Sequence, residues 1–475
     1  MRIALVAEDY YPQLGGVPEH VHNLALQLNA WGHPTTVVTS HMGDHPDPAF
    51  VRRIGTSRVI YANGGVSRIT TGWKLRRQLE HMFRAGRYDI VHVHGGLAPV
   101  LGLAAPFAAW RAGIPVVATF HSWFARSIGC RVFRRPLQRI LDRHSATIAV
   151  SQPVVDANAR YFRANWDIIP NGVDTNFFRP NGRRPDAFTD DPRLLFLGRI
   201  EPRNGLGTLL DAMPRILARY PGAVLTVAGD GPWRAYYERR ARELGTSVRF
   251  AGQVFGDRPA FYNAADLYLC PTTIASFGVT LLEAMACGTP MIVSDNLGFR
   301  SVVDGGAEAV IIPKDDPAVW ADTTIALLAD PERRAAMGRA GVAKAASFAW
   351  PRVAGRELAV YERVLTRRAR ASARPVSEPR YVRPPRKTSV IAGGAEAVVI
   401  PKDDPAVWAE TTIALLGDPA RREAMGRAGV EKAQRFAWPR IARQELAVYE
   451  RVLGRSAKPP RRLTRRTWEL ASTTR

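Results

Sequence analysis

The chain is poor in cysteine and has no long hydrophobic run. Its three cysteines, Cys130, Cys270 and Cys287, are odd in number and lack CxxC spacing, which argues against a disulfide framework. We therefore expect reduced thiols, as in cytosolic proteins. The apolar stretch 97–110 is too short to cross a membrane and ends at Arg111, so a buried helix is expected there. The first residues, MRIALVAEDYYP, are typical of a β-strand and not of a signal peptide.

Acidic residues are scarce relative to basic ones. The chain has 66 Lys and Arg against 43 Asp and Glu, a formal net charge of +23. Such an excess favours anionic partners, namely nucleic acid, anionic lipid or phosphorylated substrates. No nucleic-acid module is recognisable, so no nucleic-acid partner is expected. Much of the excess lies near the C-terminus, so part of it describes a tail and not a site.

The chain does contain a regular alternation of short Val- and Ile-rich strands with amphipathic segments. The predicted strands are RIALVAE, TTVVTS, DIVHVHG, PVVATFH and ATIAVS, then RLLFLGR, VLTVAGDG, VRFAGQV, DLYLCPT, MIVSD and AVIIP. This alternation is typical of doubly wound parallel sheets. The Pro-, Gly- and Asp-rich segment 163–192 is the expected hinge. The sequence therefore predicts two α/β domains facing a cleft, at 1–175 and 176–349, and a closing helix at 350–365.

An internal duplication follows. Residues 301–365 recur at 389–453 with about four positions in five identical. Two copies do not make a solenoid, and the copy lacks the helix with Glu283, so it cannot be a second active site. We expect the first copy to complete the domain and the second to lie beside it. The alternatives are a segment swap and a duplication without a role. The basic, Pro-rich linker 366–388 and the basic tail 454–475 are expected to be disordered or extended.

Residues 276–290, SFGVTLLEAMACGTP, place a lone carboxylate, Glu283, in an otherwise apolar helix. A glutamate in such a helix is rarely buried without a partner. The alternative is a charge that favours the N-terminal end of the helix dipole. Because the helix lies between two predicted strands, its N-terminus should lie at the carboxyl edge of a parallel sheet. That edge is where α/β proteins bind anionic ligands.

Other strand-to-helix junctions also carry residues suited to an anionic ligand. They are Gly15 and Gly16 in LGGV, His121 in ATFHS, Arg199 and Arg203 in FLGRIEPRNGLG, and Gly229 and Gly231 in VAGDGP. Glycines let backbone N–H groups approach an anion, and arginine forks suit phosphate oxygens. The histidine can hydrogen-bond a substrate, although a lone histidine is more often structural. Several such strand ends in one chain predict a diphosphate site.

Taken in order, these motifs resemble those of the retaining, nucleotide-sugar-dependent glycosyltransferases of family 4, which have the GT-B fold. The resemblance covers residue 1 to about 365 and is closest to the phosphatidylinositol mannosyltransferases. It rests on GGV (15–17), ANGGVSR (62–68), HVHGG (92–96), ATFHS (118–122), IPNGVD (169–174), LGRIEPRNG (197–205), AGDGP (228–232) and SFGVTLLEAMACGTP. The fold class it implies is α/β, with two Rossmann-like domains.

The resemblance implies transfer of a hexose from a nucleotide diphosphate sugar to a lipid or glycan acceptor, with retention and without a metal or cofactor. GDP-mannose is the first donor expected, and UDP-sugars remain open. Catalytic roles are implied for His121, beside the developing oxocarbenium charge, and for Glu283, at the ribose hydroxyls. The implied donor-binding residues are Gly16, Arg199, Arg203, Asn204, Gly229, Gly231, Ala275, Phe277 and Gly278, and the implied acceptor-binding residues are Asn63 and Arg68.

Two positions depart from the family pattern. Ala275 stands where the family usually has a glutamate that grips sugar hydroxyls, and Asn204 stands where it usually has a lysine at the diphosphate. The neighbouring Arg203 could replace that lysine. The alternative function is therefore a catalytically impaired GT-B protein that binds a sugar nucleotide or lipid without efficient turnover.

The segment 71–87 is the predicted membrane-binding helix. It combines basic residues with aromatic and aliphatic ones, as helices on anionic lipid surfaces do. Its residues are Trp73, Lys74, Leu75, Arg76, Arg77, Leu79, Met82, Phe83, Arg84 and Arg87. A second basic stretch, 126–143, has a similar character. The alternative is ordinary packing on the sheet with a solvated basic face. We expect a cytoplasmic protein peripheral to the inner face of the cell membrane.

Overall fold

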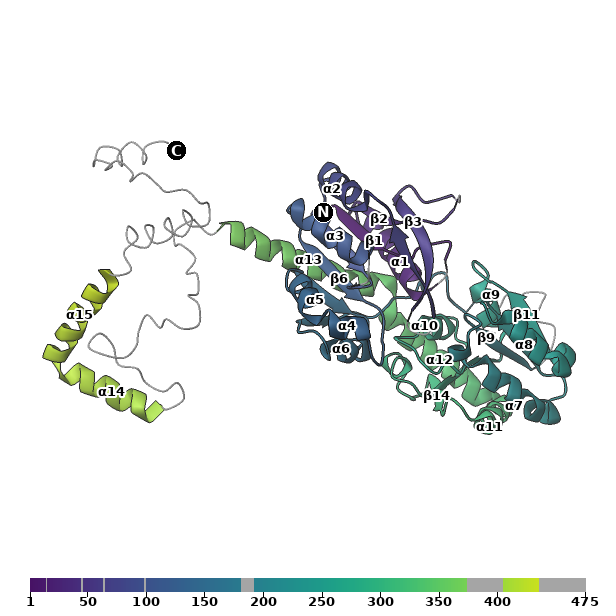
Figure 1. Cartoon of the computed structure of the whole chain (residues 1–475). Helices are drawn as coiled ribbons and strands as arrows, with labels where there is room; N and C mark the ends of the chain where they lie inside the picture. The colour runs from purple at the N-terminus through teal and green to yellow at the C-terminus, as the bar shows by residue number, and fades with distance from the viewer. Residues whose placement is uncertain are drawn as a thin grey trace. The chain divides into compact units, whose positions relative to one another are not determined.

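The computed structural model describes residues 1–13, 15–43, 46–62, 65–97, 100–180, 192–373 and 405–434. The chain divides into two compact units, Met1–Pro375 and Val376–Arg475. The first unit contains two separate sheets with helices packed against them (Figure 1), so it holds both predicted α/β domains.

The first domain is built on an eight-stranded sheet with the order β4-β3-β2-β1-β5-β6-β7-β8. Its central strands pair in parallel, and β3 pairs with β4 in antiparallel fashion. The strands are β1 (Ile3–Ala7), β2 (Thr35–His41), β3 (Val51–Ala62), β4 (Gly65–Thr71), β5 (Ile90–His94), β6 (Val116–Phe120), β7 (Ala146–Ala149) and β8 (Trp166–Ile168). The helices are α1 (Gly16–Ala30), α2 (Leu75–Gly86), α3 (Leu101–Arg111), α4 (Ile128–Val132), α5 (Arg134–Leu141) and α6 (Gln152–Ala159). The five strands predicted here are confirmed, as is the buried helix expected within 97–110.

Three strands of this sheet were not predicted, β3, β4 and β8. The β3–β4 hairpin lies at one edge of the sheet and alternates Arg, Ser and Thr with apolar residues. An antiparallel edge needs only one apolar face, so it lacks the continuous Val and Ile run that marks a buried parallel strand. Strand β8 is only 3 residues long.

The second domain is a six-stranded sheet with the order β11-β10-β9-β12-β13-β14, and its pairings are parallel. Its strands are β9 (Arg193–Leu197), β10 (Val224–Ala228), β11 (Val248–Gly252), β12 (Leu267–Cys270), β13 (Met291–Ser294) and β14 (Ala309–Ile312). Its helices are α7 (Leu206–Arg219), α8 (Arg234–Arg240), α9 (Arg258–Ala264), α10 (Val279–Ala286), α11 (Pro317–Leu328) and α12 (Pro331–Ala345). All six strands predicted from the sequence are present, and the doubly wound prediction is confirmed.

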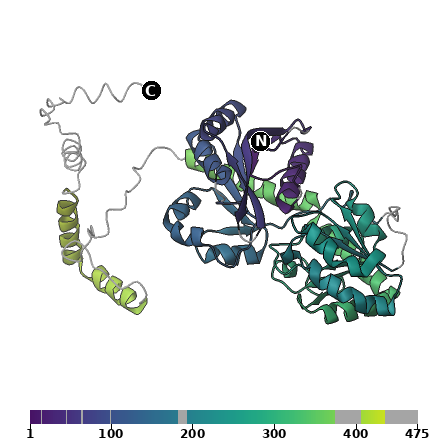
Figure 2. The same ribbon diagram turned by 45° about the vertical axis from the view of Figure 1, so that its right-hand side comes forward.

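Helix α13 (Trp350–Ala373) leaves the second domain and packs on the first, past the strands of its sheet (Figure 2). Its buried residues Trp350, Val353 and Tyr361 belong to the same apolar core as Ile3 and Leu5 of β1. The helix is longer than the predicted 350–365, so the expectation of an extended linker is wrong for 366–373. This segment, TRRARASA, contains neither Pro nor Gly and is rich in Ala and Arg, which are strong helix formers.

The second unit contains the described part of the duplicate, α14 (Pro405–Gly417) and α15 (Pro419–Gln434). These helices begin where α11 and α12 begin in the first copy, 88 residues later. Ile413, Leu416 and Val430 are exposed on them. The predictions for 389–404, 435–453, the linker beyond 373 and the tail 454–475 lie outside the described residues.

Among the described residues, no helix combines the length and the apolar character that crossing a bilayer requires. Cys130, Cys270 and Cys287 are all free thiols, as expected.

Candidate active site

The loop between β12 and α10 of the second domain forms hydrogen bonds with the first domain. These contacts bring the predicted site residues of the two domains together. The backbone N–H of Trp123, just after His121, donates to Ser276 Oγ at 2.8 Å, and Ser151 Oγ donates to the carbonyl of Ser276 at 2.8 Å. On the same boundary, a Cβ added at Gly16 would lie 3.5 Å from Val279 Cγ2. The N-termini of α1 and α10 are therefore close to each other.

Glu283 lies in the middle of α10 and is 2% exposed. Its Oε1 accepts from Arg258 Nη1 at 2.6 Å, and its Oε2 accepts from the Tyr262 hydroxyl at 2.9 Å. Burial raises the pKa of Glu283 to about 7, while Arg258 acts to lower it. The prediction of a buried carboxylate with a partner is confirmed, and the surface-dipole alternative is wrong. Arg258 and Tyr262 were not singled out, although their spacing of four places them on one face of α9.

Arg258 also contacts the other domain. Its Nη2 donates to Glu19 Oε1 of α1 at 2.7 Å, and both side chains are 12% exposed. A cavity of about 230 Å³ adjoins this contact, and its lining includes Tyr11, Glu19, Phe255, Arg258 and Glu283. The volume is below the roughly 300 Å³ at which ligand pockets begin.

The predicted diphosphate clamp is organised by a residue that was not singled out, Glu201, which is 4% exposed. Its two oxygens pair with Arg199 Nη2 and Arg203 Nε, both at 2.9 Å. The Asn204 side chain donates to the carbonyl of Arg199 at 2.6 Å. One acid placed between two arginines in RIEPR was the available sequence signal. The loop therefore presents two guanidinium groups that are held in place before any ligand binds.

The two glycines of AGDGP pack closely against the backbone of this loop. A Cβ at Gly229, where φ is +144°, would lie 1.9 Å from the carbonyl oxygen of Gly198. A Cβ at Gly231 would lie 2.5 Å from the carbonyl oxygen of Ile200. These glycines permit close packing against the arginine loop, so their effect on a donor operates through Arg199.

The donor residues of the β12–α10 loop have different environments. Phe277 is 5% exposed and packs in the core near Phe348, so its side chain is structural and only its backbone is available to a donor. The carbonyl of Ala275 packs closely on Gly298, where a Cβ would lie 2.2 Å away. Gly278 is the N-cap residue of α10.

Asp9, two residues after the end of β1, links the predicted acceptor and donor sides. Burial raises its pKa, and Arg68 and Arg199 lower it through their charge. Its Oδ1 is buried and has no hydrogen-bond partner among the described residues. The structure thus brings Arg68 of β4 and Arg199 near one carboxylate that sequence reasoning missed. Asn63, the other predicted acceptor residue, lies outside the described residues.

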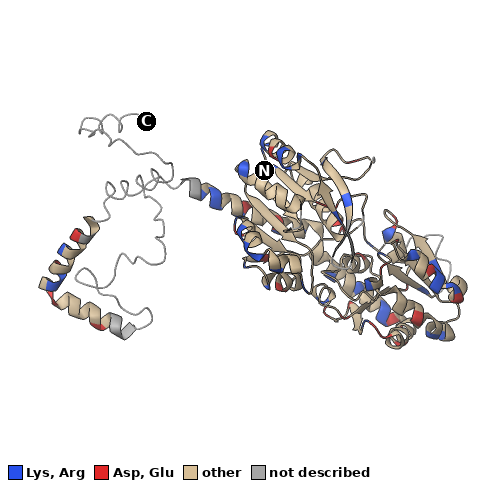
Figure 3. Cartoon of the chain, in the orientation of Figure 1, with Lys and Arg blue, Asp and Glu red and all other residues tan. Residues whose placement is uncertain are grey.

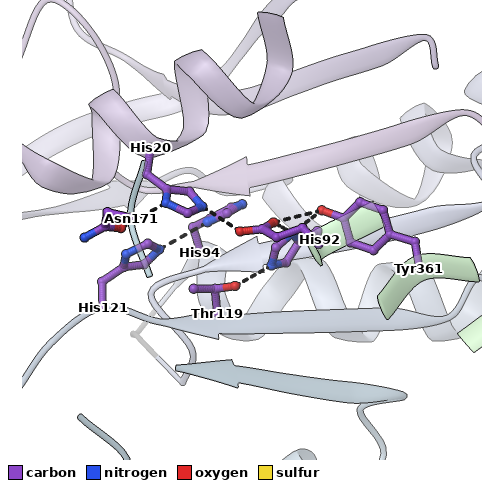
Figure 4. Close-up of polar contacts among 8 residues, drawn as sticks. His20, His92, His94, Thr119, His121, Asn171 and Tyr361 are labelled. Atoms are coloured by element: carbon purple, nitrogen blue, oxygen red, sulfur yellow. Dashed lines mark hydrogen bonds and ion pairs between the residues drawn. The ribbon is translucent and has the colours of Figure 1, made fainter. Parts of the chain in front are cut away.

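His121 belongs to a buried histidine cluster (Figure 4). Its Nε2 lies 3.2 Å from His94 Nδ1. The ring nitrogens of His20 face Asn171 Oδ1 and Glu357 Oε1, both at 2.9 Å. Burial and the neighbouring histidines hold the pKa of His94 and His121 well below the usual value, so both are neutral. Nitrogens of His20, His94 and His121 lie within 4.8 Å of one another, a spacing that suits a metal ion, and His94 Nε2 is buried without a hydrogen-bond partner among the described residues.

In the predicted membrane-binding helix the basic residues are exposed, but most of the apolar residues are not. Trp73 is 96% exposed, and Lys74, Arg76 and Arg77 are also exposed. However, Leu75, Leu79 and Phe83 are buried in the core beside α3. The expectation that these residues face lipid is wrong, because the sheet and α3 cover the apolar face of α2.

The second basic stretch has the exposed apolar residues that α2 lacks. Ile128, Val132 and Phe133 of α4 and the α4–α5 junction are 81%, 67% and 58% exposed. Six exposed arginines accompany them along the same segment, and Figure 3 colours the ribbon blue at every Lys and Arg. The six arginines are Arg126, Arg131, Arg134, Arg135, Arg139 and Arg143. We call these apolar and basic residues the α4–α5 patch.

Two family models together match most of the first unit. "Glycosyltransferase Family 4" matches residues 14–177, and "Glycosyl transferases group 1" matches residues 179–344.

Curated relatives include phosphatidyl-myo-inositol mannosyltransferases. That of Mycobacterium tuberculosis is 32% identical over 371 residues, covering 77% of this chain and 97% of the relative. That of Mycolicibacterium smegmatis is 32% identical over 368 residues, covering 77% and 94%. A D-inositol 3-phosphate glycosyltransferase of Segniliparus rotundus is 31% identical over 334 residues, covering 64% and 72%.

Solved structures share the fold. Sucrose-phosphate synthase from Thermosynechococcus elongatus has a TM-score of 0.60 at 23% identity and covers 77% of this chain and 99% of its own. Anabaena HepE in complex with UDP has a TM-score of 0.61 at 18% identity, covering 76% and 100%.

Proposed function

Because the chain belongs to the family 4 glycosyltransferases of the GT-B fold, we propose that it transfers a hexose from a nucleotide diphosphate sugar to an inositol phospholipid. GDP-mannose is the proposed donor, and the reaction proceeds with retention and without a metal or cofactor. The observation that carries the proposal is the pair of prepared ligand groups at the cleft, the Arg199–Glu201–Arg203 loop and the buried Glu283. The names of the mannosyltransferase relatives support the donor sugar and the acceptor.

The leaving nucleoside diphosphate develops negative charge, and the arginine loop is built to stabilise it. Glu201 holds both guanidinium groups in place, so they need little reorganisation when charge develops. Because Glu201 balances one of the two positive charges, the loop keeps a net charge of +1. That charge remains available for phosphate oxygens.

At the sugar, the neutral state of His121 suits a transition state with oxocarbenium character. A protonated imidazole would repel the positive charge that develops at the anomeric carbon, whereas a neutral one can hydrogen-bond the sugar. Glu283 is assigned to the ribose hydroxyls. Because Arg258 and Tyr262 already contact its two oxygens, the ribose has to share them or displace these partners.

The two departures from the family pattern have defined consequences. Asn204 holds the carbonyl of Arg199, so Arg203 supplies the second cation that a lysine usually provides. Ala275 offers no carboxylate to the sugar hydroxyls, so we expect weaker discrimination between hexoses.

We further propose that the protein acts at an anionic membrane surface through the α4–α5 patch and Trp73. Three exposed apolar side chains on a segment with six exposed arginines match the chemistry of a phospholipid headgroup layer. Flotation with vesicles containing anionic lipid tests this, with Ile128→Ser/Phe133→Ser as the variant. Val342→Ser, at a half-exposed residue of α12, is the control. Equal flotation of all three proteins, or flotation that anionic lipid does not increase, contradicts the patch.

The function itself is tested by incubating the full chain with a panel of sugar nucleotides and vesicles that contain phosphatidylinositol. We expect transfer from GDP-mannose, detected as a glycosylated lipid by mass spectrometry. Tight donor binding with neither transfer nor hydrolysis, for lipid and glycan acceptors alike, would favour the non-catalytic alternative.

A further inference from the structure

Helix α13 places a fully buried carboxylate, Glu357, in the histidine cluster of the first domain. Its Oε1 lies 2.9 Å from His20 Nε2, and both side chains are 0% exposed. The Tyr361 hydroxyl donates to its Oε2 at 3.3 Å, and His92 Nδ1 lies 3.6 Å from the same oxygen. Burial raises the pKa of Glu357, but His20, His92 and Tyr361 together outweigh burial, and the pKa lies below its ordinary value. Glu357 is therefore ionised.

The hydrogen bonds around His20 fix the position of its ring. One ring nitrogen lies 2.9 Å from the Glu357 carboxylate, and the other lies 2.9 Å from Asn171 Oδ1. His20 and Glu357 thus form a fully buried hydrogen-bonded pair between α1 and α13.

This pair lies against His121. The rings of His20 and His121 are in edge contact, with centroids 5.0 Å apart and planes at 75° to each other. Trp350 of α13 makes a second edge contact with His20, at 5.2 Å and 77°. His20 also acts on the pKa of His121, after burial, in the direction that keeps it neutral, and Asn171 hydrogen-bonds His121 as well. The chain of contacts runs from Glu357 through His20 and Asn171 to the residue assigned to the sugar.

A purely structural role explains this carboxylate poorly. Buried ion pairs are often no more stabilising than apolar residues of similar size, because desolvation offsets their attraction. The neighbouring buried positions of α13, such as Val353, Val360 and Val364, are apolar and anchor the helix without charge. Anchoring of α13 therefore does not explain why a buried carboxylate stands at position 357.

We propose that Glu357 is a positioning residue for the transfer reaction. From α13 its carboxylate holds the His20 ring in place, and His20 with Asn171 orients His121 toward the transferred sugar. This inference rests on the proposed function, because His121 is assigned to the sugar there. It makes the C-terminal helix of the first unit part of the active site.

The test compares three variants of the full chain with the wild type below their melting temperatures. Glu357→Gln keeps the shape and removes the charge, and Glu362→Gln makes the same change on the exposed face of α13. The double variant His20→Leu/Glu357→Leu removes both members of the buried pair, so it leaves no unpaired buried carboxylate. For each protein we measure kcat, the KM for GDP-mannose, and the stoichiometry and Kd of donor binding.

We expect Glu357→Gln and the double variant to lose about 10- to 100-fold in kcat, the range for a hydrogen bond to a charged group. Donor stoichiometry and Kd should stay close to wild type, and Glu362→Gln should be unchanged. If Glu357 had only a structural role, its variants would have a lower melting temperature and a smaller fraction of molecules that bind donor. The molecules that still bind donor would keep the wild-type kcat. Wild-type kcat in the double variant overturns the inference. An inactive wild type overturns the proposed function instead.

Discussion

Replacing Arg258 with methionine should destabilise the protein in a pH-dependent way. Arg258 is the cation that contacts Glu283 at 2.6 Å and Glu19 at 2.7 Å. The substitution leaves two carboxylates in a largely buried site with no guanidinium between them. Removing one partner of a buried ion pair typically costs about 3–5 kcal/mol.

The pH dependence follows from the pKa of Glu283, which is already raised from 4.5 to about 7. A carboxyl group whose pKa is raised by folding binds more protons in the native state, so its contribution to stability falls as pH rises through that pKa. Without Arg258 the pKa should rise further. The variant can then relieve its strain by protonating Glu283 at pH 5.5 but much less at pH 8. We therefore expect a loss of about 3 kcal/mol or more at pH 8 and a smaller loss at pH 5.5.

Urea unfolding of wild type and variant at both pH values measures this difference. Arg215→Met is the matched control, because Arg215 pairs with Asp322 at 2.6 Å but both side chains are more than half exposed. An exposed pair is worth about 0–1 kcal/mol, with little pH dependence in this range. Equal losses for the two variants, or an Arg258 loss that does not change with pH, would refute the reasoning.

Three further predictions follow from the same contacts. Arg199→Ala should lower kcat/KM for the donor by about 10²- to 10³-fold in steady-state assays, as removal of one preorganised donor to a developing anion does, and Arg215→Ala should leave it unchanged. Gly229→Ala should lower the melting temperature sharply, because its Cβ would lie 1.9 Å from the Gly198 carbonyl oxygen. Gly198→Ala should lower it only slightly, because a Cβ at Gly198 meets nothing within 4 Å. Similar melting temperatures for the two variants would contradict this prediction. Glu8, whose pKa burial raises to about 7, should make stability fall as pH rises from 4.5 to 7, and Glu8→Gln should flatten that slope in unfolding experiments at a series of pH values.

The strands that position the site could be predicted from sequence because parallel strands are buried on both faces. RIALVAE and VLTVAGDG are largely apolar runs that end in polar or glycine residues, and both are interior strands of their sheets. The β3–β4 hairpin was missed because an edge hairpin carries no such run. The end of α13 was placed too early because a basic composition was taken as a sign of disorder, although Ala and Arg favour helix.

The site was predictable where chemistry is local and not where it depends on distant partners. Glu283 was recognised because a carboxylate in an apolar helix needs a partner, but Arg258 lies on another helix and Glu19 in another domain. Glu201 could have been found, since its pairing with Arg199 and Arg203 lies within one loop. The buried pair of His20 with Glu357 joins residues 337 positions apart, and no local pattern indicates it.

The apolar face of α2 shows the limit of reading amphipathic helices. Leu75, Leu79 and Phe83 have the spacing of a lipid-facing stripe, but the same spacing serves packing on a sheet. Only the tertiary structure distinguishes the two uses. The exposed apolar residues Ile128, Val132 and Phe133 belong instead to the α4–α5 patch.

The central claim is that the arginine loop and the histidine cluster act on a sugar nucleotide during catalysis. The most direct measurement is the transfer of labelled mannose from GDP-mannose to phosphatidylinositol vesicles by the wild type, with Arg199→Ala alongside it. We expect the wild type to form a mannosylated lipid with the anomeric configuration of the donor. We expect the variant to lose about 10²- to 10³-fold in the rate of transfer. Donor binding without product, in the presence of every acceptor tried, would contradict it.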